Sequence, residues 1–487
     1  MTDVQRTTQE PPPLPGSAVA HDTIARSFLA LGTGEAIARV IAFGAMLVVA
    51  RRLGAEGLGV VSFATAVLLY LSRVVDAGFD MGIGIREAAA RRDSLGAFVP
   101  AVLAFRLLLA MVVIALGSVS ALLLLPAPEG PVIALYTLTL VPMALSARWV
   151  LTGLDRTSMA GIARSLGELV VFLAVVLVVR GSADTWRIPV AQLLGDTVAA
   201  TVVVIGLRRL SVPVGVSWHT DVIRPLIARH IAPYVGSTLL GIVLFNADIL
   251  FLRLYRDAAT VGLYASAYAL VSFLLNIGGT YALTLLPALT RLASDRSTRQ
   301  EVYEQAATKV FLAILPITVG GGMIATGIMR TVYGAEFETA GAILAVLLVS
   351  APLSLLRSVA TAAIMAERRE DYLLRIVGVS AVVNVLLNVV AVPIWGMMGA
   401  ATVTIATELL RVALAQRYAT RLGFSTPVLT RAWKPVVAAS VMAVLLLTPI
   451  ARNPWLAVPA GAAVYAAVLI ALGALTVRRG GLPELRV

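Results

Sequence analysis

Charged side chains inside long apolar stretches are the residues of this sequence that could do chemistry. A charge in apolar surroundings is costly, so each such residue needs a partner or a water-filled space. Guanidinium groups bind phosphates as planar forks, whereas carboxylates can compensate charge or exchange protons. We expect substrate-binding roles for Arg39, Arg73, Arg106, Arg253, Arg357 and Asn246, and roles in ion coupling or charge compensation for Glu35, Asp76 and Asp248.

The first two of these stretches each carry a pair of opposite charges. Glu35 and Arg39 are spaced i, i+4 with the acid first, the better order for an ion pair on a helix. They either neutralise each other while packing the helix or together face a cavity that binds an anion. Arg73 precedes Asp76 by three residues and lies about two turns deep, where it either binds an anion or extends to the headgroups. Asp80 fits a charge at the helix end.

Other deep charges lack a partner on their own helix. Arg106 is one, so it is a cavity arginine or its partner lies on a neighbouring helix. Asn246 and Arg253 share a helix face, whereas Asp248 lies on nearly the opposite side of the helix from Asn246. The three therefore cannot all line one surface.

Polar stripes mark two later stretches. Arg357 follows Ser354 at helical spacing, and Ser380, Asn384 and Asn388 form an i, i+4, i+8 stripe. Such asparagine stripes join helices about as often as they line sugar-binding sites. Both interpretations stay open for this stripe.

The composition places these residues in a membrane protein. The chain has 487 residues, 59% hydrophobic and 14% charged, with a mean hydropathy of +0.91. Soluble domains have about a quarter charged residues, so soluble enzymes and nucleic-acid binders are excluded. The net charge of +12 is scattered through short connectors and does not form a nucleic-acid surface.

No catalytic or cofactor motif is present in the sequence. There is no cysteine, and the three histidines (His21, His219 and His230) lack metal-ligand spacing. No phosphate-binding GxxxxGK[ST] motif occurs, so the chain does not hydrolyse ATP by that means. We expect no metal, no cofactor and no enzymatic activity.

The apolar stretches predict about fourteen membrane-spanning helices after a disordered tail over residues 1–22. A span needs about 20 apolar residues, and barrel strands would alternate polar and apolar positions instead. The predicted spans are residues 24–50, 58–80, 98–124, 132–150, 162–180, 188–206, 231–252, 262–286, 309–329, 340–365, 376–392, 399–416, 436–450 and 455–477.

Basic residues in alternate connectors predict the orientation. One set of connectors, including both termini, holds 24 lysines and arginines, and the other set holds 7. Basic connectors stay on the cytoplasmic side. Both termini are therefore predicted to be cytoplasmic, with an even number of spans between them.

An internal repeat predicts two lobes. The segment from Gly59 to Val67 is similar to the segment from Gly262 to Leu270, six spans later and in the same orientation. This arrangement is typical of parallel repeats about an axis along the membrane normal. We expect lobes over residues 23–229 and 230–418, each with six helices, and two further helices with a tail over 419–487.

Several segments resemble polysaccharide-biosynthesis proteins, the oligosaccharide flippases of the multidrug/oligosaccharidyl-lipid/polysaccharide exporter superfamily. The similarity covers most of residues 24–418 in the family's order. It rests on the segments Ala50–Gly59, Arg86–Ala89, Asn246–Asp248, Val261–Ala267, Leu286–Arg291, Tyr333–Phe337 and Pro393–Ala401.

The resemblance implies a fold of fourteen helices and a function. The function is flipping of isoprenoid-pyrophosphate-linked oligosaccharide, a precursor of surface polysaccharide such as lipopolysaccharide, across a bacterial inner membrane. Arg39 occupies a place similar to cavity arginines in the first helix of related flippases, and Asp248 matches a common acid of the seventh helix. Glu35, Arg73, Arg106 and Arg357 match no family motif. Implied partners are the lipid-linked glycan, a proton or sodium ion, and polysaccharide polymerase or assembly proteins.

Two other functions stay open at this point. A cation-coupled multidrug antiporter of the same superfamily would prefer an acidic cavity, whereas arginines predominate here. A membrane glycosyltransferase or polymerase would need a long outer loop, and no outer connector exceeds about a dozen residues. The flippase hypothesis predicts that Arg39→Ala abolishes complementation while the protein remains in the membrane.

Overall fold

The protein is described from a computed structural model covering residues 17–80, 82–91, 95–226, 246–425, 433–476 and 484–485. For residues 17–33, 276–280, 282–283, 476 and 484–485 the description is of the backbone alone. The N-terminal segment predicted as a tail lies outside these ranges up to residue 16. From Ser17 onward it is helical, because the first helix extends outward through an alanine-containing segment that favours helix.

The described chain is almost entirely helical. The first half of the chain contains α1 (Ser17–Asp76), α2 (Ile83–Ala90), α3 (Leu95–Leu124), α4 (Glu129–Thr137), α5 (Leu140–Leu145), α6 (Arg148–Gly153), α7 (Thr157–Val178), η1 (Ser182–Asp184), α8 (Arg187–Arg209) and α9 (Thr220–Leu226). Residues 246–255 are helical as well. The second half contains α11 (Ala258–Arg291), α12 (Arg296–Met323), α13 (Ala325–Tyr333), η3 (Ala335–Ala340), α14 (Gly341–Leu348), α15 (Ser350–Ala366), α16 (Glu370–Arg421), α18 (Trp433–Leu446), η4 (Pro449–Arg452) and α19 (Pro454–Ala471). A two-residue antiparallel pair, β1 (Leu475–Thr476) with β2 (Glu484–Leu485), follows.

Within the described residues, ten helices are long and apolar enough to cross a membrane. Two of them, α1 and α16, each contain a bend and each include two of the predicted spans. The bends occur at Gly54 (φ 71°) and Gly396 (φ 57°). Residues with a side chain rarely adopt this backbone conformation. Most of the predicted span 231–252 lies outside the described residues, so the count of fourteen stays a prediction.

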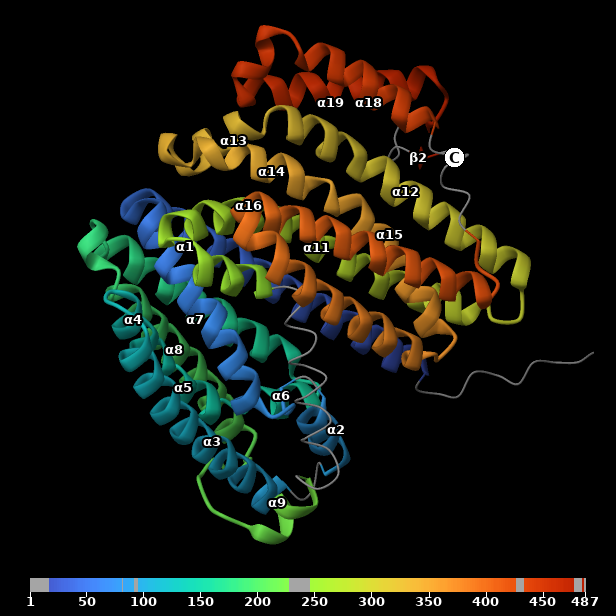
Figure 1. The fold of residues 1–487 in the computed structure, drawn as a ribbon. Coiled ribbons are helices and arrows are strands. Elements are labelled where there is room, and N and C mark those ends of the chain that lie inside the picture. Colours follow the sequence, from blue (N-terminus) through green and yellow to red (C-terminus); the bar gives the residue numbers. More distant parts are fainter. Residues whose placement is uncertain are drawn as a thin grey trace, which may run out of the picture.

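The helices form two adjoining bundles (Figure 1). In the first bundle α1 packs against α7, α7 against α8, and α3 against α4. In the second bundle α15 packs against both α11 and α16, and α12 packs against α15. The pair α18 and α19 covers α12 at the edge of the second bundle. The principal contact between the bundles joins α1 to α11.

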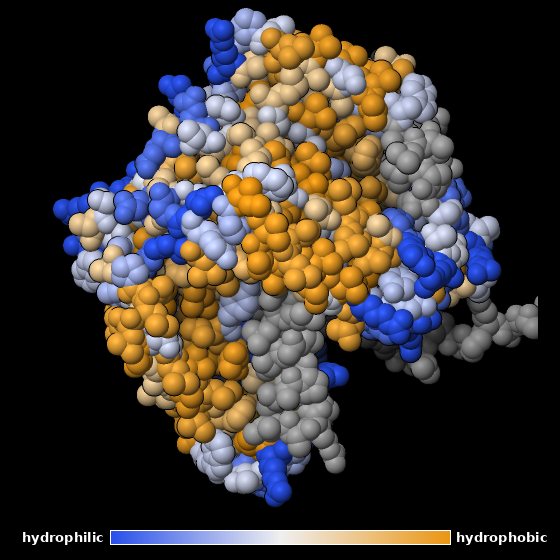
Figure 2. Space-filling model, viewed as in Figure 1, coloured by the Kyte–Doolittle hydropathy of each residue, from blue (hydrophilic) through white to orange (hydrophobic). Residues whose placement is uncertain are grey.

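The outer surface carries broad apolar areas, as expected for a protein surface in contact with lipid. Figure 2 shows broad hydrophobic areas over both bundles, with hydrophilic residues gathered at their ends. Side chains such as Leu123, Leu124 and Trp455 are 76–79% exposed. An exposed apolar area of this extent marks a membrane or a partner interface on a folded protein. Together with the long apolar helices, it defines a polytopic membrane protein, as the composition predicts.

Asparagine and aspartate side chains in the connectors cap the N-terminal ends of several helices. Asp257 caps α11 by accepting a hydrogen bond from the Thr260 amide at 2.8 Å, and Asn453 caps α19. Asp295 caps α12, and its hydrogen bonds from Thr298 and Ser297 lower the pKa of the carboxyl to about 2. These connectors therefore fix where the membrane helices start.

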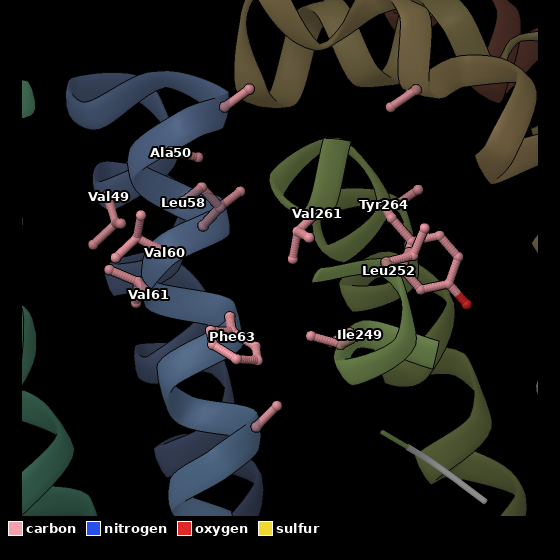
Figure 3. Packing of buried hydrophobic residues seen from close by; sticks show 14 of the residues in the cluster. Val49, Ala50, Leu58, Val60, Val61, Phe63, Ile249, Leu252, Val261 and Tyr264 are labelled. Atoms are coloured by element: carbon pink, nitrogen blue, oxygen red, sulfur yellow. The ribbon is translucent and has the colours of Figure 1, made fainter. Parts of the chain in front are cut away.

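The two repeated glycine segments lie directly against each other between the bundles. A Cβ atom at Gly59 would lie 1.7 Å from the carbonyl oxygen of Ala258, and one at Gly262 would lie 1.9 Å from the carbonyl oxygen of Ala55. Beside this contact Phe63 of α1 faces Ile249 of the second bundle (Figure 3). We call the Gly59–Gly262 approach the glycine contact. Because it is backbone against backbone, only glycine fits at either position.

Candidate functional site

Two arginines hold the bundles together beside the glycine contact. Arg51, at the end of the first predicted span, donates to the carbonyl oxygens of Val332 and Thr331 at 2.9 and 2.8 Å. Arg253, at the end of the seventh, binds Glu129 through two parallel hydrogen bonds of 2.6 and 2.7 Å. Each arginine thus reaches the end of a helix in the opposite bundle, α13 for Arg51 and α4 for Arg253. We call these two contacts the arginine clasps.

A third contact between the bundles lies at the bend of α1. Glu336 accepts a hydrogen bond from the Ala55 amide at 2.9 Å, immediately after Gly54. The bend interrupts the hydrogen-bond pattern of the helix at this amide, and the carboxylate accepts the hydrogen bond of the amide instead. A side chain at Gly54 would lie 2.8 Å from the same carboxylate. The glycine contact, the clasps and this bond together close one end of the interface between the bundles.

The facing helices are more open toward their other end. In α1, residues 58–66 are mostly buried, but residues 67–74 are all partly exposed. In α11, residues 264–267 are buried, while most of residues 268–275 are partly exposed. Burial therefore decreases from the glycine contact to residue 74 of α1 and to residue 275 of α11, whereas Val75 and Asp76 at the end of α1 are buried again.

Arg106 is completely buried, and the protein engages both of its terminal nitrogens, whereas its Nε atom is buried without a partner. Its guanidinium lies 3.5 Å from Asp76 and 3.4 Å from Asp80 and donates to the carbonyl oxygens of Ser146 and Met143 at 3.0 and 3.1 Å. The predicted partner on a neighbouring segment therefore exists. Because these acceptors occupy both terminal nitrogens, we interpret Arg106 as fastening α1, α3 and α5 together rather than as an open anion site.

Removing Arg106 is expected to destabilise the first bundle. Arg106→Met leaves Asp76 without its ion-pair partner and Asp80 with only the longer contact to Arg148, and breaking a buried ion pair in this way costs about 3–5 kcal/mol. Thermal unfolding of the purified protein in detergent should show a clearly lower midpoint.

The control for Arg106→Met is the exposed pair of Arg91 and Glu87, whose charged atoms are 2.8 Å apart. Arg91→Met should leave the midpoint nearly unchanged, because exposed pairs contribute little. Equal midpoints for both variants would contradict this interpretation of Arg106.

Arg73 differs from the other deep arginines. Its side chain is partly buried on the open part of α1, and its Nε atom is buried without a hydrogen-bond partner. Among the side chains that the structure describes, no carboxylate forms an ion pair with it. Asp76 is close enough to interact electrostatically but is committed to Arg106. Arg73 thus presents a membrane-embedded positive charge with unused donors.

Arg39 and Glu35 lie together on α1, as the spacing predicts. Their charged atoms are 3.7 Å apart, and the side chains are 46% and 38% exposed. Arg164 and Glu168 form a second i, i+4 pair on the neighbouring α7, at 3.1 Å. A half-exposed pair of this kind is weak. Arg39 is therefore accessible to a ligand at little cost.

Asp248 lies in the interior of the second bundle. Its carboxylate accepts a short hydrogen bond from the Tyr264 hydroxyl, which also lies 3.4 Å from the Thr404 hydroxyl. Only 6% of Asp248 is exposed. Asn246 is half-buried two residues earlier. The structure therefore places Asp248 between α11 and α16, close enough to Tyr70 of α1 to interact with it electrostatically.

Arg357 binds an acid that the sequence analysis did not select. Its Nε atom donates to Glu408 at 3.1 Å, and its Nη2 atom donates to the Ser354 hydroxyl at 2.8 Å. The same Glu408 carboxylate accepts a short hydrogen bond from Arg411. We call Arg357, Glu408 and Arg411 the Arg357 triad. It joins α15 to α16.

The asparagine stripe of α16 is used to join helices. Asn384 donates to the Thr407 hydroxyl at 3.2 Å, across the bend of α16, and Asn388 donates back to Asn384. All of Ser380, Asn384 and Asn388 are buried. Of the two interpretations of this stripe, the structure supports helix packing.

Sequence reasoning missed three charged groups of these sites: Glu129, Glu408 and Arg411. Glu129 follows the apolar stretch that ends at residue 124, which is typical of a connector, although it is only 3% exposed. Glu408 and Arg411 are spaced i, i+3 inside a predicted span, a signal of the same kind as Glu35 and Arg39. No described group of three or more histidine, cysteine, aspartate or glutamate side chains could hold a metal ion.

The almost entirely helical, two-bundle fold with charged side chains between long apolar helices is that of a polytopic membrane protein. A family model described as "Polysaccharide biosynthesis protein" matches residues 24–293, more than half of the sequence. The chain belongs to this polysaccharide biosynthesis protein family, as the sequence motifs indicate.

Individual proteins show the same relationship. A probable low-salt glycan biosynthesis flippase, Agl15 of Haloferax volcanii, is 23% identical over 173 residues, which is 35% of this chain and 37% of that protein. The fold is similar to that of the lipid II flippase MurJ in an inward closed conformation, with a TM-score of 0.76, 13% identity and coverage of 91% of this chain and 98% of that one. An inward-facing multidrug resistance transporter of the MATE family has a TM-score of 0.60, with 14% identity and coverage of 79% of this chain and 95% of that one.

Proposed function

We propose that the protein is a flippase for an isoprenoid-pyrophosphate-linked oligosaccharide. It moves this precursor of surface polysaccharide from the cytoplasmic to the outer leaflet by alternating access. The observation that carries the proposal is the unpaired Arg73 on the open part of α1. A cation with unused donors inside a membrane protein needs an anion, and the pyrophosphate of a lipid-linked glycan is one. Membership of the polysaccharide biosynthesis family supports this choice.

The closed end of the interface corresponds to the outer side in this proposal. The connectors at the glycine contact belong to the set with 7 basic residues, and the opposite set holds 24. The described conformation is then closed to the outside and more open toward the cytoplasm. Both termini are cytoplasmic, the membrane is the bacterial inner membrane, and the lobes comprise residues 23–229 and 230–418, with 419–487 as an appended unit.

The arginines divide into two groups according to whether protein acceptors occupy their donor groups. Arg39 and Arg73 keep donors available and bind the pyrophosphate. Arg106 and Arg253 donate to protein acceptors and act by fastening helices. Of Glu35, Asp76 and Asp248, only Asp248 forms no ion pair with a described arginine, so proton or sodium coupling is assigned to it.

Breaking an arginine clasp is expected to reduce export. Glu129→Gln leaves Arg253 without its counter-charge and weakens closure of the outer end, so output of surface glycan should fall roughly tenfold, the effect of about 1.4 kcal/mol. Exchange of the two charges, Glu129→Arg with Arg253→Glu, should recover part of the output. A quantitative glycan blot of complemented cells measures both.

An exposed pair at the same end provides the matched control for the clasp. Arg330 and Glu338 lie 3.7 Å apart and are 65% and 44% exposed. Glu338→Gln should leave output within about twofold of the wild type, because exposed pairs contribute little. A loss as large as that of Glu129→Gln would mean that charge at this end, not the clasp, is responsible.

The proposed function is tested on lipid extracts of a strain lacking the gene. A complete isoprenoid-pyrophosphate oligosaccharide should accumulate while the surface polymer disappears, and the wild-type gene should reverse both changes. A truncated glycan would identify an enzyme of the same pathway instead. An unchanged lipid pool with new sensitivity to cationic drugs would identify an antiporter.

A further inference from the structure

We propose that the Arg357 triad is an oxyanion subsite that binds an acidic group carried by the glycan. The subsite deepens the proposed function and rests on it. It assigns the substrate class as a lipid-linked oligosaccharide with an acidic sugar. The oxyanion is a carboxylate on the glycan, not the pyrophosphate.

The first support is the geometry of the Arg357 guanidinium. Two of its three nitrogens are occupied, Nε by Glu408 and Nη2 by the Ser354 hydroxyl. No described residue accepts a hydrogen bond from Nη1, and this atom is not among the buried atoms without partners. The side chain is 16% exposed. Arg357 is therefore held in one orientation by two protein contacts, with its third nitrogen accessible.

The second support is the charge of the triad. Glu408 is shared between two guanidiniums, since Arg411 binds its other carboxylate oxygen. The three side chains of the triad thus carry one positive charge in excess. Only 8% of the Glu408 side chain is exposed. Water therefore screens these charges weakly, and one bound monoanion would balance the triad.

The third support is an aromatic surface beside the triad. Tyr268 interacts electrostatically with both Glu408 and Arg411. Its ring stacks on Tyr264 with a centroid distance of 6.1 Å and an interplanar angle of 13°. Tyr268 is partly exposed on the open part of α11. Binding sites for organic ligands combine such aromatic surfaces with a few placed polar groups.

The stoichiometry favours a sugar carboxylate over the pyrophosphate. A pyrophosphate carries at least two negative charges and many acceptor oxygens, whereas the triad offers one excess charge and one accessible nitrogen. The pyrophosphate has Arg73 and Arg39 on the other bundle. A uronic acid matches both features, with a ring for Tyr268 and a single carboxylate for Arg357.

The test is a binding comparison on the purified full-length protein in lipid nanodiscs. Three probes are used: an isoprenoid-pyrophosphate trisaccharide ending in glucuronate, the same lipid ending in glucose, and isoprenoid pyrophosphate without sugar. We expect the wild type to prefer the glucuronate probe over the glucose probe by roughly tenfold, the effect of one charge-assisted hydrogen bond. Arg357→Gln should abolish this preference and leave the affinities for the other two probes unchanged.

A matched control uses another buried arginine of the second bundle. Arg299 binds Glu367 at 2.5 Å and stacks on Phe424, away from the triad. Arg299→Gln should keep the tenfold preference even if it lowers stability. Arg357→Lys keeps the charge but loses the fork and should retain part of the preference.

The possible results distinguish failure of the proposed subsite from failure of the proposed flippase function. Equal affinity of the wild type for the glucuronate and glucose probes overturns the subsite but leaves the flippase intact. Weaker binding of the sugar-free pyrophosphate by Arg357→Gln also overturns it, because the oxyanion would then be the pyrophosphate. Failure of the wild type to bind any probe counts against the flippase itself. The wild-type comparison decides even if Arg357→Gln does not fold.

Discussion

Arg73→Ala is expected to lower surface glycan output to below about a tenth of the wild-type level while the protein stays in the membrane. Arg73 has no ion-pair partner among the described side chains, so its removal leaves no carboxylate uncompensated and should cost little stability. It does remove charge-assisted hydrogen bonds to the pyrophosphate. One to two such bonds correspond to roughly a ten- to hundredfold weaker interaction.

The comparison that isolates this effect uses a nearby arginine. Arg148 lies 3.9 Å from Asp80, which also pairs with Arg106, and its side chain is 32% exposed. Arg148→Ala should keep most of the output. Arg73→Lys should be intermediate, since it keeps the charge without the fork. Normal output from Arg73→Ala, with normal protein levels, would remove Arg73 from the substrate site.

Gly59→Ala is expected to have an effect of similar size through a different cause. A single methyl group at this position would lie 1.7 Å from the carbonyl oxygen of Ala258. A backbone atom cannot rotate away as a side chain can, so α1 and α11 must separate. The conformation closed at the glycine contact becomes less stable, and overpacking of this kind costs about 1–3 kcal/mol or more. Glycan output should fall at least roughly fivefold.

The glycine contact can also be tested from its other side, at Gly262. Gly262→Ala should have the same effect, because a methyl group there would lie 1.9 Å from the carbonyl oxygen of Ala55. Gly322, in the membrane helix α12, has no atom within 4 Å of its Cβ position. Gly322→Ala should therefore be neutral. If Gly322→Ala reduced output as much as the other two variants, the glycine contact would not explain the loss.

The sequence predicts the helical membrane fold because burial in lipid is encoded locally. A stretch of apolar residues must be a helix in a bilayer, and Gly54 and Gly396 bend long helices where the chain reverses. The similarity of the segments that begin at Gly59 and Gly262 is visible in the sequence, but nothing in the sequence indicates that these two segments touch.

The partner of each charged residue could not be predicted from the sequence, because it depends on how helices that are distant in the sequence pack against each other. Depth in a span shows that a charge is costly, but it does not show which partner compensates it. Arg253 and Glu129 are 124 residues apart, and Arg357 and Glu408 are 51 apart. From the sequence, both arginines have the same predicted role as Arg73. Only the structure shows that Arg73 lacks such a partner among the described side chains.

The most direct test of the central claim is transport by the purified protein. Liposomes containing it are loaded symmetrically with a fluorescent isoprenoid-pyrophosphate oligosaccharide, and a glycosidase is added outside. With the wild type, we predict that digestion proceeds beyond the outer leaflet until nearly all of the glycan is cut, whereas Arg73→Ala liposomes stop at about half. Digestion that stops at half with the wild-type protein, in liposomes that remain sealed, would contradict the flippase account.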